Sequence, residues 1–510
     1  SSPDTGDAYY NSTDNKLTVY NGSDWVSAGG GGTIEMVASG AIANGDTCIV
    51  NTNGTVSKIV STHNEVNSPT VATFNQFNSG DTEMIDSVYD PDEQKIIVVY
   101  RDDGNNSYGT CVVGDIDSAT GGITWGTPVV FHSQSTASVR CTYEEDVDRL
   151  LVVFRDAPDL KAVAASISGT VPTFGSVTTI QTSGINNNTH DIVYDKNNQR
   201  SVVVYEDGGA SDRPSARTLQ VTSGVTVGNI GSKTTIQSIT GRGEPMRIAY
   251  DDNAQKCVVV YGQAGENADC RVVTLTSSGS NITVGTVATV ASYVTAQYNI
   301  VYDESAQKHV IIYTAQGDST KGGRVRVATV SGSTISLGQE DTWLSSDDNA
   351  AFSHSSMVYI PELQKCVAAF RNLKNSNHGN YIKFTVNTGT NRVTTSSIFE
   401  FIQSTIEFTA AVYNRNSKVL TIPFRNVDAA GIGSAANIAL TTESTNLTAN
   451  NFIGFSDAAY TDGQTAKIQI EGSVDDAQTG LTTAKVHYVQ TDGSLSTTAG
   501  NPSVSAGIAL

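Results

Sequence analysis

The chain has 510 residues, with 31 Lys and Arg against 51 Asp and Glu, so its formal net charge at neutral pH is −20. A nucleic-acid-binding surface needs a basic footprint, and an anionic membrane attracts Lys and Arg, so we expect neither as a partner. No apolar run approaches the roughly 18 residues of a membrane span. Because 38% of the residues are hydrophobic, the chain can still bury a substantial core. A soluble globular protein is the expected class.

Residues 1–32 are predicted to form a small hairpin and a flexible linker. The hairpin prediction rests on apolar and polar residues that alternate around the turn Asn21-Gly22, and Gly29 to Gly32 give the linker. A small β module is expected in residues 33–68, where Asn-Gly pairs again mark turns between short apolar runs.

An internal repeat of 51 to 57 residues fills most of residues 69–445. Each copy contains a tyrosine anchor and, eleven residues later, a second aromatic residue. The anchors are Tyr89, Tyr143, Tyr194, Tyr250, Tyr302, Tyr359 and Tyr413. The second aromatics are Tyr100, Phe154, Tyr205, Tyr261, Tyr313, Phe370 and Phe424. Between them, a polar turn precedes a β-branched run such as IIVVY or VVVY, which predicts a hairpin whose second strand is buried on both faces.

Two further strands follow each hairpin, so every repeat is predicted to supply four short strands. Four strands in each of seven copies predict an all-β fold, a seven-bladed β-propeller with four-stranded blades. The last copy has no clear fourth strand. We therefore expect residues 69–78, which precede the first copy, to form the outer strand of the seventh blade and to close the ring.

Residues 446–510 carry the same strand-and-turn pattern and are predicted to form a C-terminal β module. Pairing of the two flanks into one small β domain is the alternative. The N-terminal string YYNSTDNKLTVYNGSDWV resembles an anchor-side segment of bacteriophage tail fibres and other virion proteins. The strings IGFSDAAYTDGQTAKIQIEGSVDDAQTGL and YVQTDGSLSTTAGNPSVSAG resemble a β module at the ends of tail-fibre-like proteins, particularly of phages of marine bacteria.

This resemblance implies a virion-surface protein, located on the extracellular particle, that contacts other virion proteins and a bacterial host. It also implies a homotrimer, the usual state of fibres. The matching strings carry no catalytic or binding constellation, so no ligand residue is transferred from the resemblance.

Catalytic motifs are not found in the sequence, and we predict no catalytic residue, no cofactor and no metal site. Seven histidines show no metal-ligand spacing, and there is no nucleophile elbow or phosphate-binding loop. His190 and His354 are expected on the first strands of their repeats. The six scattered cysteines are expected to be buried thiols in strands.

Recurring charged residues have a structural and a catalytic interpretation. An acid follows five of the anchors, as at Asp90 and Glu144, and turn capping is favoured over catalysis. Arginines follow four of the second aromatics: Arg101, Arg155, Arg371 and Arg425. One repeat offset favours pairing with nearby acids over a sialidase-type arginine triad.

The position three residues before each anchor is predicted to line the central channel, because the first strand of a propeller blade lies next to the axis. The resulting polar ring is Asp86, Arg140, Asp191, Arg247, Asn299 and Ser356. Its two interpretations are ion pairing between blades around a wet channel and a ligand or cation site.

Five variable loops, between the second and third strands of their repeats, are expected to gather on one face of the ring. Function often lies in such loops. The candidate ligand-binding residues are Asn105, Tyr108, Asp207, Asp212, Glu266, Asp269, Asp318, Asn377, His378 and Tyr381. The tyrosines and His378 would stack on sugars, and the amides and acids would bind hydroxyl groups.

The leading hypothesis is therefore a tail fibre or spike that recognises a host surface polysaccharide or receptor without cleaving it. A glycan depolymerase on the particle is the first alternative, and it requires two close carboxylates in a groove. A structural decoration protein of the capsid or tail is the second.

Overall fold

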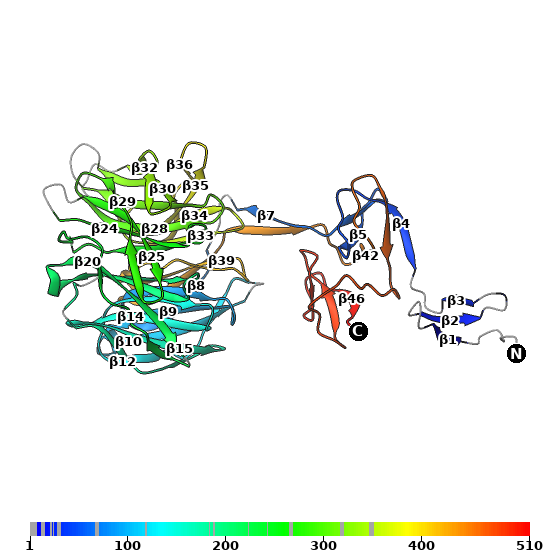
Figure 1. Cartoon of the computed structure of the whole chain (residues 1–510), viewed down its shortest axis with the longest axis horizontal. Helices are drawn as coiled ribbons and strands as arrows, with labels where there is room; N and C mark the ends of the chain where they lie inside the picture. The colour runs from blue at the N-terminus through cyan, green and yellow to red at the C-terminus, as the bar shows by residue number, and fades with distance from the viewer. Residues whose placement is uncertain are drawn as a thin grey trace. The chain divides into compact units, whose positions relative to one another are not determined.

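A computed structural model describes residues 8–11, 16–20, 23, 25–27, 32–66, 71–117, 120–182, 184–186, 189–222, 224–241, 243–264, 269–316, 321–345 and 351–510. These residues form strands, turns and short 3-10 helices, without any α-helix. Accordingly, the described part of the chain has no helix of the length and apolarity that crossing a membrane demands. Two compact units are present, Glu65–Thr441 and a smaller one built from Ser1–Asn64 with Thr442–Leu510 (Figure 1).

Four sheets of the larger unit share one antiparallel topology. Three strands follow one another in the sheet, and two short strands then pair in succession with the third, so that they form a broken outer edge. The first two sheets consist of β13 (Ala137–Glu144), β14 (Arg149–Asp156), β15 (Asp159–Ser168), β16 (Val171–Phe174) and β17 (Thr178–Gln181), and of β18 (Asp191–Asp195), β19 (Arg200–Asp207), β20 (Arg213–Thr222), β21 (Thr226–Gly228) and β22 (Thr234–Thr235). The next two consist of β23 (Arg247–Asp251), β24 (Lys256–Gly262), β25 (Cys270–Ser278), β26 (Asn281–Val284) and β27 (Ala288–Ala291), and of β28 (Thr295–Asp303), β29 (Lys308–Ala315), β30 (Gly322–Ser331), β31 (Thr334–Leu337) and β32 (Asp341–Ser345).

The first and the last two repeats are linked into one 13-stranded sheet. The first repeat gives β8 (Val71–Asp90), β9 (Lys95–Asp102), β10 (Tyr108–Ile116), β11 (Ile123–Trp125) and β12 (Val129–Ser135). The last two give β33 (Phe352–Ile360), β34 (Lys365–Asn372), β35 (His378–Asn387), β36 (Arg392–Thr395), β37 (Phe399–Glu407), β38 (Val412–Asn414), β39 (Val419–Asn426) and β40 (Ile432–Ala439).

Strand β8 connects the two ends of the repeat. Its first half, from Val71 to Asp81, pairs with β40 of the last repeat, and its second half, from Thr82 to Asp90, pairs with β9 of the first. The chain segment before the first repeat therefore supplies the outer strand of the last one. Backbone groups of β40 that would form an open edge are hydrogen-bonded instead.

Hydrophobic core clusters join each repeat to the next. Val152 of β14 packs with Val99 of β9 in one cluster, for example, and Phe370 of β34 packs with Ile312 of β29 in another. The cluster of Tyr100 and Ala435 joins β9 to β40. The chain of cores thus returns to its start, and the all-β propeller fold is confirmed, whereas the number of blades stays a prediction from the repeat.

The turn of every hairpin ends in a residue with left-handed backbone, which stands five positions after the anchor tyrosine. These residues are Gln94, Asp148, Gln199, Gln255, Gln307, Gln364 and Lys418, with φ between 51° and 59°. The four aspartates that follow an anchor accept hydrogen bonds from their turn, as Asp251 Oδ1 does from Ala254 N at 2.8 Å. The favoured capping role is therefore seen for these four, whereas Glu144 instead accepts from Ser201 Oγ and Val221 N of the next repeat, which corrects the expectation for that copy.

Anchor tyrosines tie each hairpin turn to the next repeat. Tyr250 Oη accepts a hydrogen bond from Asn197 N at 3.2 Å, and Tyr359 Oη accepts one from Ser305 N at 3.2 Å. Tyr413 Oη donates to Glu362 Oε2 at 2.7 Å. The second aromatics lie in the core instead, and each is at most 1% exposed. The two aromatics of the repeat therefore serve different purposes, one between hairpins and one within the core.

The two flanks of the repeat form one sheet in the smaller unit. Its strand order is β4 (Thr33–Val37), β43 (Thr465–Gln469), β42 (Phe452–Ser456), β5 (Thr47–Val50) and β6 (Val56–Lys58). Three further sheets are β1 (Ala8–Asn11) with β2 (Lys16–Tyr20) and β3 (Trp25–Ser27), β44 (Val486–Val489) with β45 (Leu495–Ser496) and β46 (Val504–Ile508), and β7 (Ser61–Glu65) with β41 (Thr441–Thr445). All six cysteines of the chain are buried free thiols in strands, as the sequence predicts.

Candidate functional site

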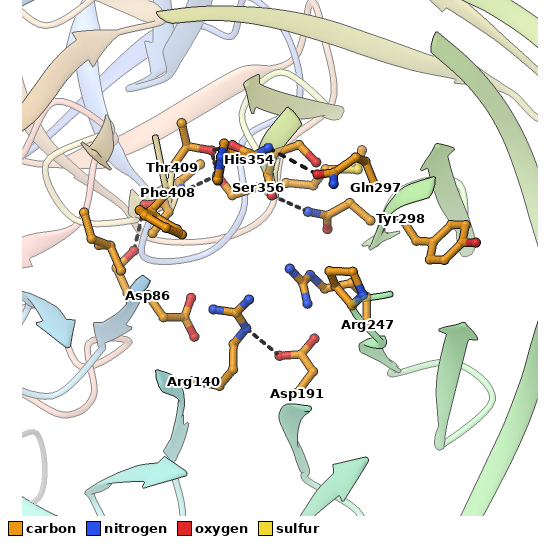
Figure 2. A pocket seen from close by; sticks show the side chains of 18 of the residues that line it. Asp86, Arg140, Asp191, Arg247, Gln297, Tyr298, His354, Ser356, Phe408 and Thr409 are labelled. Atoms are coloured by element: carbon orange, nitrogen blue, oxygen red, sulfur yellow. Dashed lines mark hydrogen bonds and ion pairs between the residues drawn. The ribbon is translucent and has the colours of Figure 1, made fainter. Parts of the chain in front are cut away.

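One cavity of about 280 Å³ lies where the first strands of the repeats begin. It is lined from β8, β13, β18, β23, β28 and β33 and from residues 408–411, which precede β38. The structure brings all six residues of the predicted ring to this cavity: Asp86, Arg140, Asp191, Arg247, Asn299 and Ser356. Ala410 occupies the seventh equivalent position and also lines it. Figure 2 shows the labelled side chains around the central space.

Residues with a left-handed backbone recur beside this cavity. Met84, Ser138, Gln297, His354 and Phe408 each stand five residues before their anchor and have φ between 48° and 55°. The pairing of the first strand with the second is interrupted beside four of them, between Glu83 and Asp86 for example. Such bulges re-aim side chains and cost of order 1–3 kcal/mol each in backbone strain.

Four of these five residues line the cavity, at a position that is not among the predicted site residues. None of them is a glycine, so residue type gives no signal of a left-handed backbone. The fixed offset from the anchor is the only regularity that marks them, and it becomes meaningful only once the bulges are seen.

Consecutive strands supply the charged half of the cavity. Asp86 Oδ2 accepts a hydrogen bond from Cys141 N at 2.9 Å, and Asp191 Oδ2 accepts one from Ile248 N at 3.1 Å. Arg140 Nε lies 3.8 Å from Asp191 Oδ1. Each acid therefore holds the first strand of the following repeat, and the predicted ion pairing between repeats is present for Arg140.

Burial is the largest influence on the pKa values of Asp86, Asp191 and Arg247 in the charged half. It raises the pKa of Asp86 and of Asp191, against the lowering effect of the neighbouring arginines. Burial and, next, the like charge of Arg140 lower the pKa of Arg247 to about 10. Because each of these groups is less easily charged than in water, the cavity favours partners that supply compensating charge.

Uncharged polar groups form the other half. Asn299 Nδ2 donates to Ser355 O at 2.8 Å, and Ser356 Oγ accepts from Ala411 N at 2.7 Å. Gln297 Oε1 accepts from His354 N at 3.3 Å. These contacts fix the amide and hydroxyl groups in place, so the neutral half is as well ordered by hydrogen bonds as the charged half.

Two of the loop candidates are buried, and this corrects the prediction that they contact a ligand. Tyr381 lies within β35, is 1% exposed and stacks on Phe399 with ring centres 5.2 Å apart. Asp207 is 0% exposed and binds Gly209 N at 3.1 Å and Lys233 Nζ at 2.5 Å. Both side chains hold their own repeat together.

Other loop candidates lie at the surface, where they are wholly or partly exposed. Asn105 is exposed in a 3-10 turn (Asp103–Asn105), and Tyr108, Asp212 and Asn377 are partly exposed. Glu266 and Asp318 lie outside the described residues.

Asp269 and His378 already have protein partners. Asp269 Oδ2 pairs with Arg271 Nη2 at 2.6 Å, and His378 Nδ1 lies 2.9 Å from Glu400 Oε2. None of the described loop candidates lines the cavity that the ring residues form.

Three of the four arginines that follow the second aromatics pair with acids, as the pairing interpretation expects, and Arg155 bonds to a backbone oxygen instead. Arg101 Nη2 donates to Asp103 Oδ2 at 2.9 Å. Arg371 and Arg425 share Glu407, at 3.0 Å and 2.6 Å, and Arg155 Nε donates to the backbone oxygen of Ile185. Within the described ranges, no group of three or more His, Cys, Asp and Glu is arranged to hold a metal ion.

No protein family and no curated protein matches the sequence. Among solved structures, the chain is similar to the β-propeller domain of Cps50 (Swd1) from Myceliophteria thermophila, with 10% identity, a TM-score of 0.44 and coverage of 72% of this chain and all of that one.

The Dos1 propeller is 11% identical, with a TM-score of 0.43 over 73% of this chain and 95% of that one. A point mutant of NanB sialidase from Streptococcus pneumoniae is 9% identical, with a TM-score of 0.42 over 74% of this chain and 70% of that one. At these values the likeness carries no argument about function. The propeller assignment rests on the strand pairings and the closed chain of cores.

Proposed function

We propose that this chain is a virion tail fibre or spike that recognises a host surface glycan or receptor without cleaving it. The observation that carries the proposal is the polar cavity among the first strands. Guanidinium, carboxylate, amide and hydroxyl groups converge there on one space of about 280 Å³. This is close to the lower limit of ligand pockets, about 300 Å³, and suits a single sugar residue or terminal group.

The contacts of the cavity favour binding over cleavage. A glycosidase needs two carboxyl groups, one to transfer a proton and one to act as nucleophile or base. Asp86 and Asp191 each accept a backbone hydrogen bond from the next repeat, so both are committed to holding strands. Arg371 and Arg425 are likewise bound to Glu407 and do not form a free arginine cluster.

The place of the protein on a virus particle rests on the resemblance of the two flanks to tail-fibre segments. In this proposal the smaller unit contacts other virion proteins, and the chain assembles as a homotrimer. The acidic net charge of −20 is compatible with a partner other than nucleic acid.

Labelled full-length protein should be incubated with intact cells of candidate hosts and with their isolated surface polysaccharide. We expect saturable cell binding that the polysaccharide displaces, with no new reducing ends. Release of reducing ends would overturn the non-cleaving proposal in favour of a depolymerase. Neither binding nor release across the hosts would overturn recognition and favour a decoration protein.

A further inference from the structure

We infer that the cavity takes an acidic sugar residue, with Arg247 binding its carboxylate and the amide and hydroxyl half binding its hydroxyl groups. This inference rests on the proposed function, because it names the ligand class of the same cavity. It also replaces the cation that the sequence left open with an anion.

Arg247 feels the charges of Asp191 and Asp86 but makes no close ion pair with either among the described residues. Its Nη1 donates to Met246 O at 2.8 Å. Within the part of the chain that the structure describes, no carboxylate oxygen lies within 4.0 Å of its nitrogens, since Asp191 places Oδ1 toward Arg140 and Oδ2 on Ile248 N. A planar guanidinium with donors to spare matches a carboxylate, which accepts two parallel hydrogen bonds.

The charges around Arg247 make it the end of an alternating series. Asp86, Arg140, Asp191 and Arg247 follow one another on β8, β13, β18 and β23. Each of the four has a neighbour of opposite charge in this series, and Arg247 has Asp191 on one side only, because the next repeat brings the uncharged Asn299. An added anion beside Arg247 continues the alternation, whereas an added cation would lie against a guanidinium.

Burial and electrostatics support the same conclusion. The charge of Arg247 is disfavoured by burial and by Arg140, which lower its pKa to about 10. A bound carboxylate would offset both effects, and a guanidinium in a partly dry cavity gives a stronger hydrogen bond to an anion than one in water. Asp191 and Asp86 offset part of this cost, and a neutral ligand at the same place would add nothing to that compensation.

The opposite half of the cavity presents uncharged amide and hydroxyl groups. Ser356 and Thr409 lie across the space from the charged residues (Figure 2), and Asn299 also lines the cavity. Gln297 accepts a hydrogen bond through Oε1, so its amide Nε2 is left to donate. A ligand with a carboxylate on one edge and hydroxyl groups on the other fits this division, and a uronic or keto-acid sugar has that form.

The test uses the full chain and calorimetry with a short oligogalacturonate, its methyl ester and a sulfated galactan oligosaccharide. The ester is the matched probe, because it keeps the sugar and removes the charge. We expect the acid to bind at least ten-fold more tightly than the ester, and Arg247→Met to abolish that preference. Arg247→Lys should keep part of it, since the cation remains.

Arg415→Met is the control, because Arg415 is exposed in the turn before β39 and pairs with Glu304, away from the cavity lining. It should leave the preference unchanged, and thermal unfolding should show that each variant is folded. Equal binding of acid and ester, preference for the sulfated probe, or no binding of any probe would overturn the inference. If host cells still bind in those cases, the proposed function survives, and loss of all cell binding would overturn both.

Discussion

The carboxylate of Asp86 accepts a hydrogen bond from the backbone nitrogen of Cys141, with Oδ2 and N 2.9 Å apart. A side chain of the first repeat thus holds the first strand of the second. Asp191 and Ser356 make the same contact with Ile248 and Ala411, each in the repeat that follows its own. The ring that lines the cavity is therefore also a set of links between repeats.

Removal of one such link should destabilise the larger unit. We expect Asp86→Ala to lower the free energy of unfolding by about 1–3 kcal/mol, because it leaves the buried Cys141 N–H without an acceptor. Asp86→Asn keeps an oxygen and should cost less. Urea unfolding measures both, and Asp92→Ala, in an exposed turn, is the control. Equal stability of Asp86→Ala and the control would contradict the link.

Glu144 should make stability depend on pH between about 4.5 and 7. It is 1% exposed, accepts hydrogen bonds from Ser201 Oγ and Val221 N, and burial raises its pKa to about 7. A raised folded-state pKa means that the folded chain holds its proton longer than the unfolded chain. The stabilising contribution is complete below about 4.5 and is lost as pH rises through about 7.

Glu144→Gln mimics the protonated side chain, so the variant should be more stable than the wild type at high pH. We expect it to be more stable by roughly 3 kcal/mol at pH 8 and of similar stability at pH 4.5, from about 1.4 kcal/mol for each pKa unit. Chemical unfolding at the two pH values gives the difference. If the variant is stabilised equally at both pH values, the cause is packing, and the predicted titration of Glu144 is contradicted.

Titration of His309 should have the opposite effect, because it lowers the stability of the folded chain as the pH falls. It is 0% exposed, packs against Tyr302 with ring centres 5.1 Å apart, and burial lowers its pKa to about 3. A lowered histidine pKa gives stability that is present above about 6.5 and lost as pH falls toward 3. At pH 5 the loss is about 2 kcal/mol.

Replacement of His309 by leucine should remove this part of the acid sensitivity. Leucine fits the repeat, because Leu150 and Leu420 occupy the equivalent position in two other copies. We expect the stability difference between pH 7.5 and pH 5 to shrink by about 2 kcal/mol relative to wild type. An unchanged difference in urea unfolding would show that His309 takes up no proton on unfolding in that range.

Left-handed glutamines in the hairpin turns offer a stabilising change. Gln255 is exposed with φ 53°, a conformation that costs a side-chain-bearing residue about 1–2 kcal/mol and costs glycine little. We expect Gln255→Gly to raise the melting temperature and Gln255→Val to lower it, because a β-branched side chain tolerates this backbone least. A melting temperature lowered by glycine would contradict the turn geometry.

Much of the fold could be read from the sequence because its determinants are local. The distance between the two aromatics, the polar turns and the β-branched runs specify hairpins within about a dozen residues, and recurrence of the hairpin specifies a ring of similar sheets. The ring position at Asp86 and its equivalents could be read for the same reason, since it keeps a fixed offset from each anchor. Its members do converge on one cavity.

The tertiary structure decided what those positions do. The bulges at Met84 and His354 are seen only in the strand pairing, because neither residue is a glycine that would mark a left-handed backbone in the sequence. Tyr381 and Asp207 look like loop residues in the sequence, but contacts across the sheet bury both. Which acids lie near Arg247 is likewise set by the side chains that the closed ring brings together. Sequence patterns thus determine short-range pairing, while burial and charge neighbours depend on residues far apart along the chain.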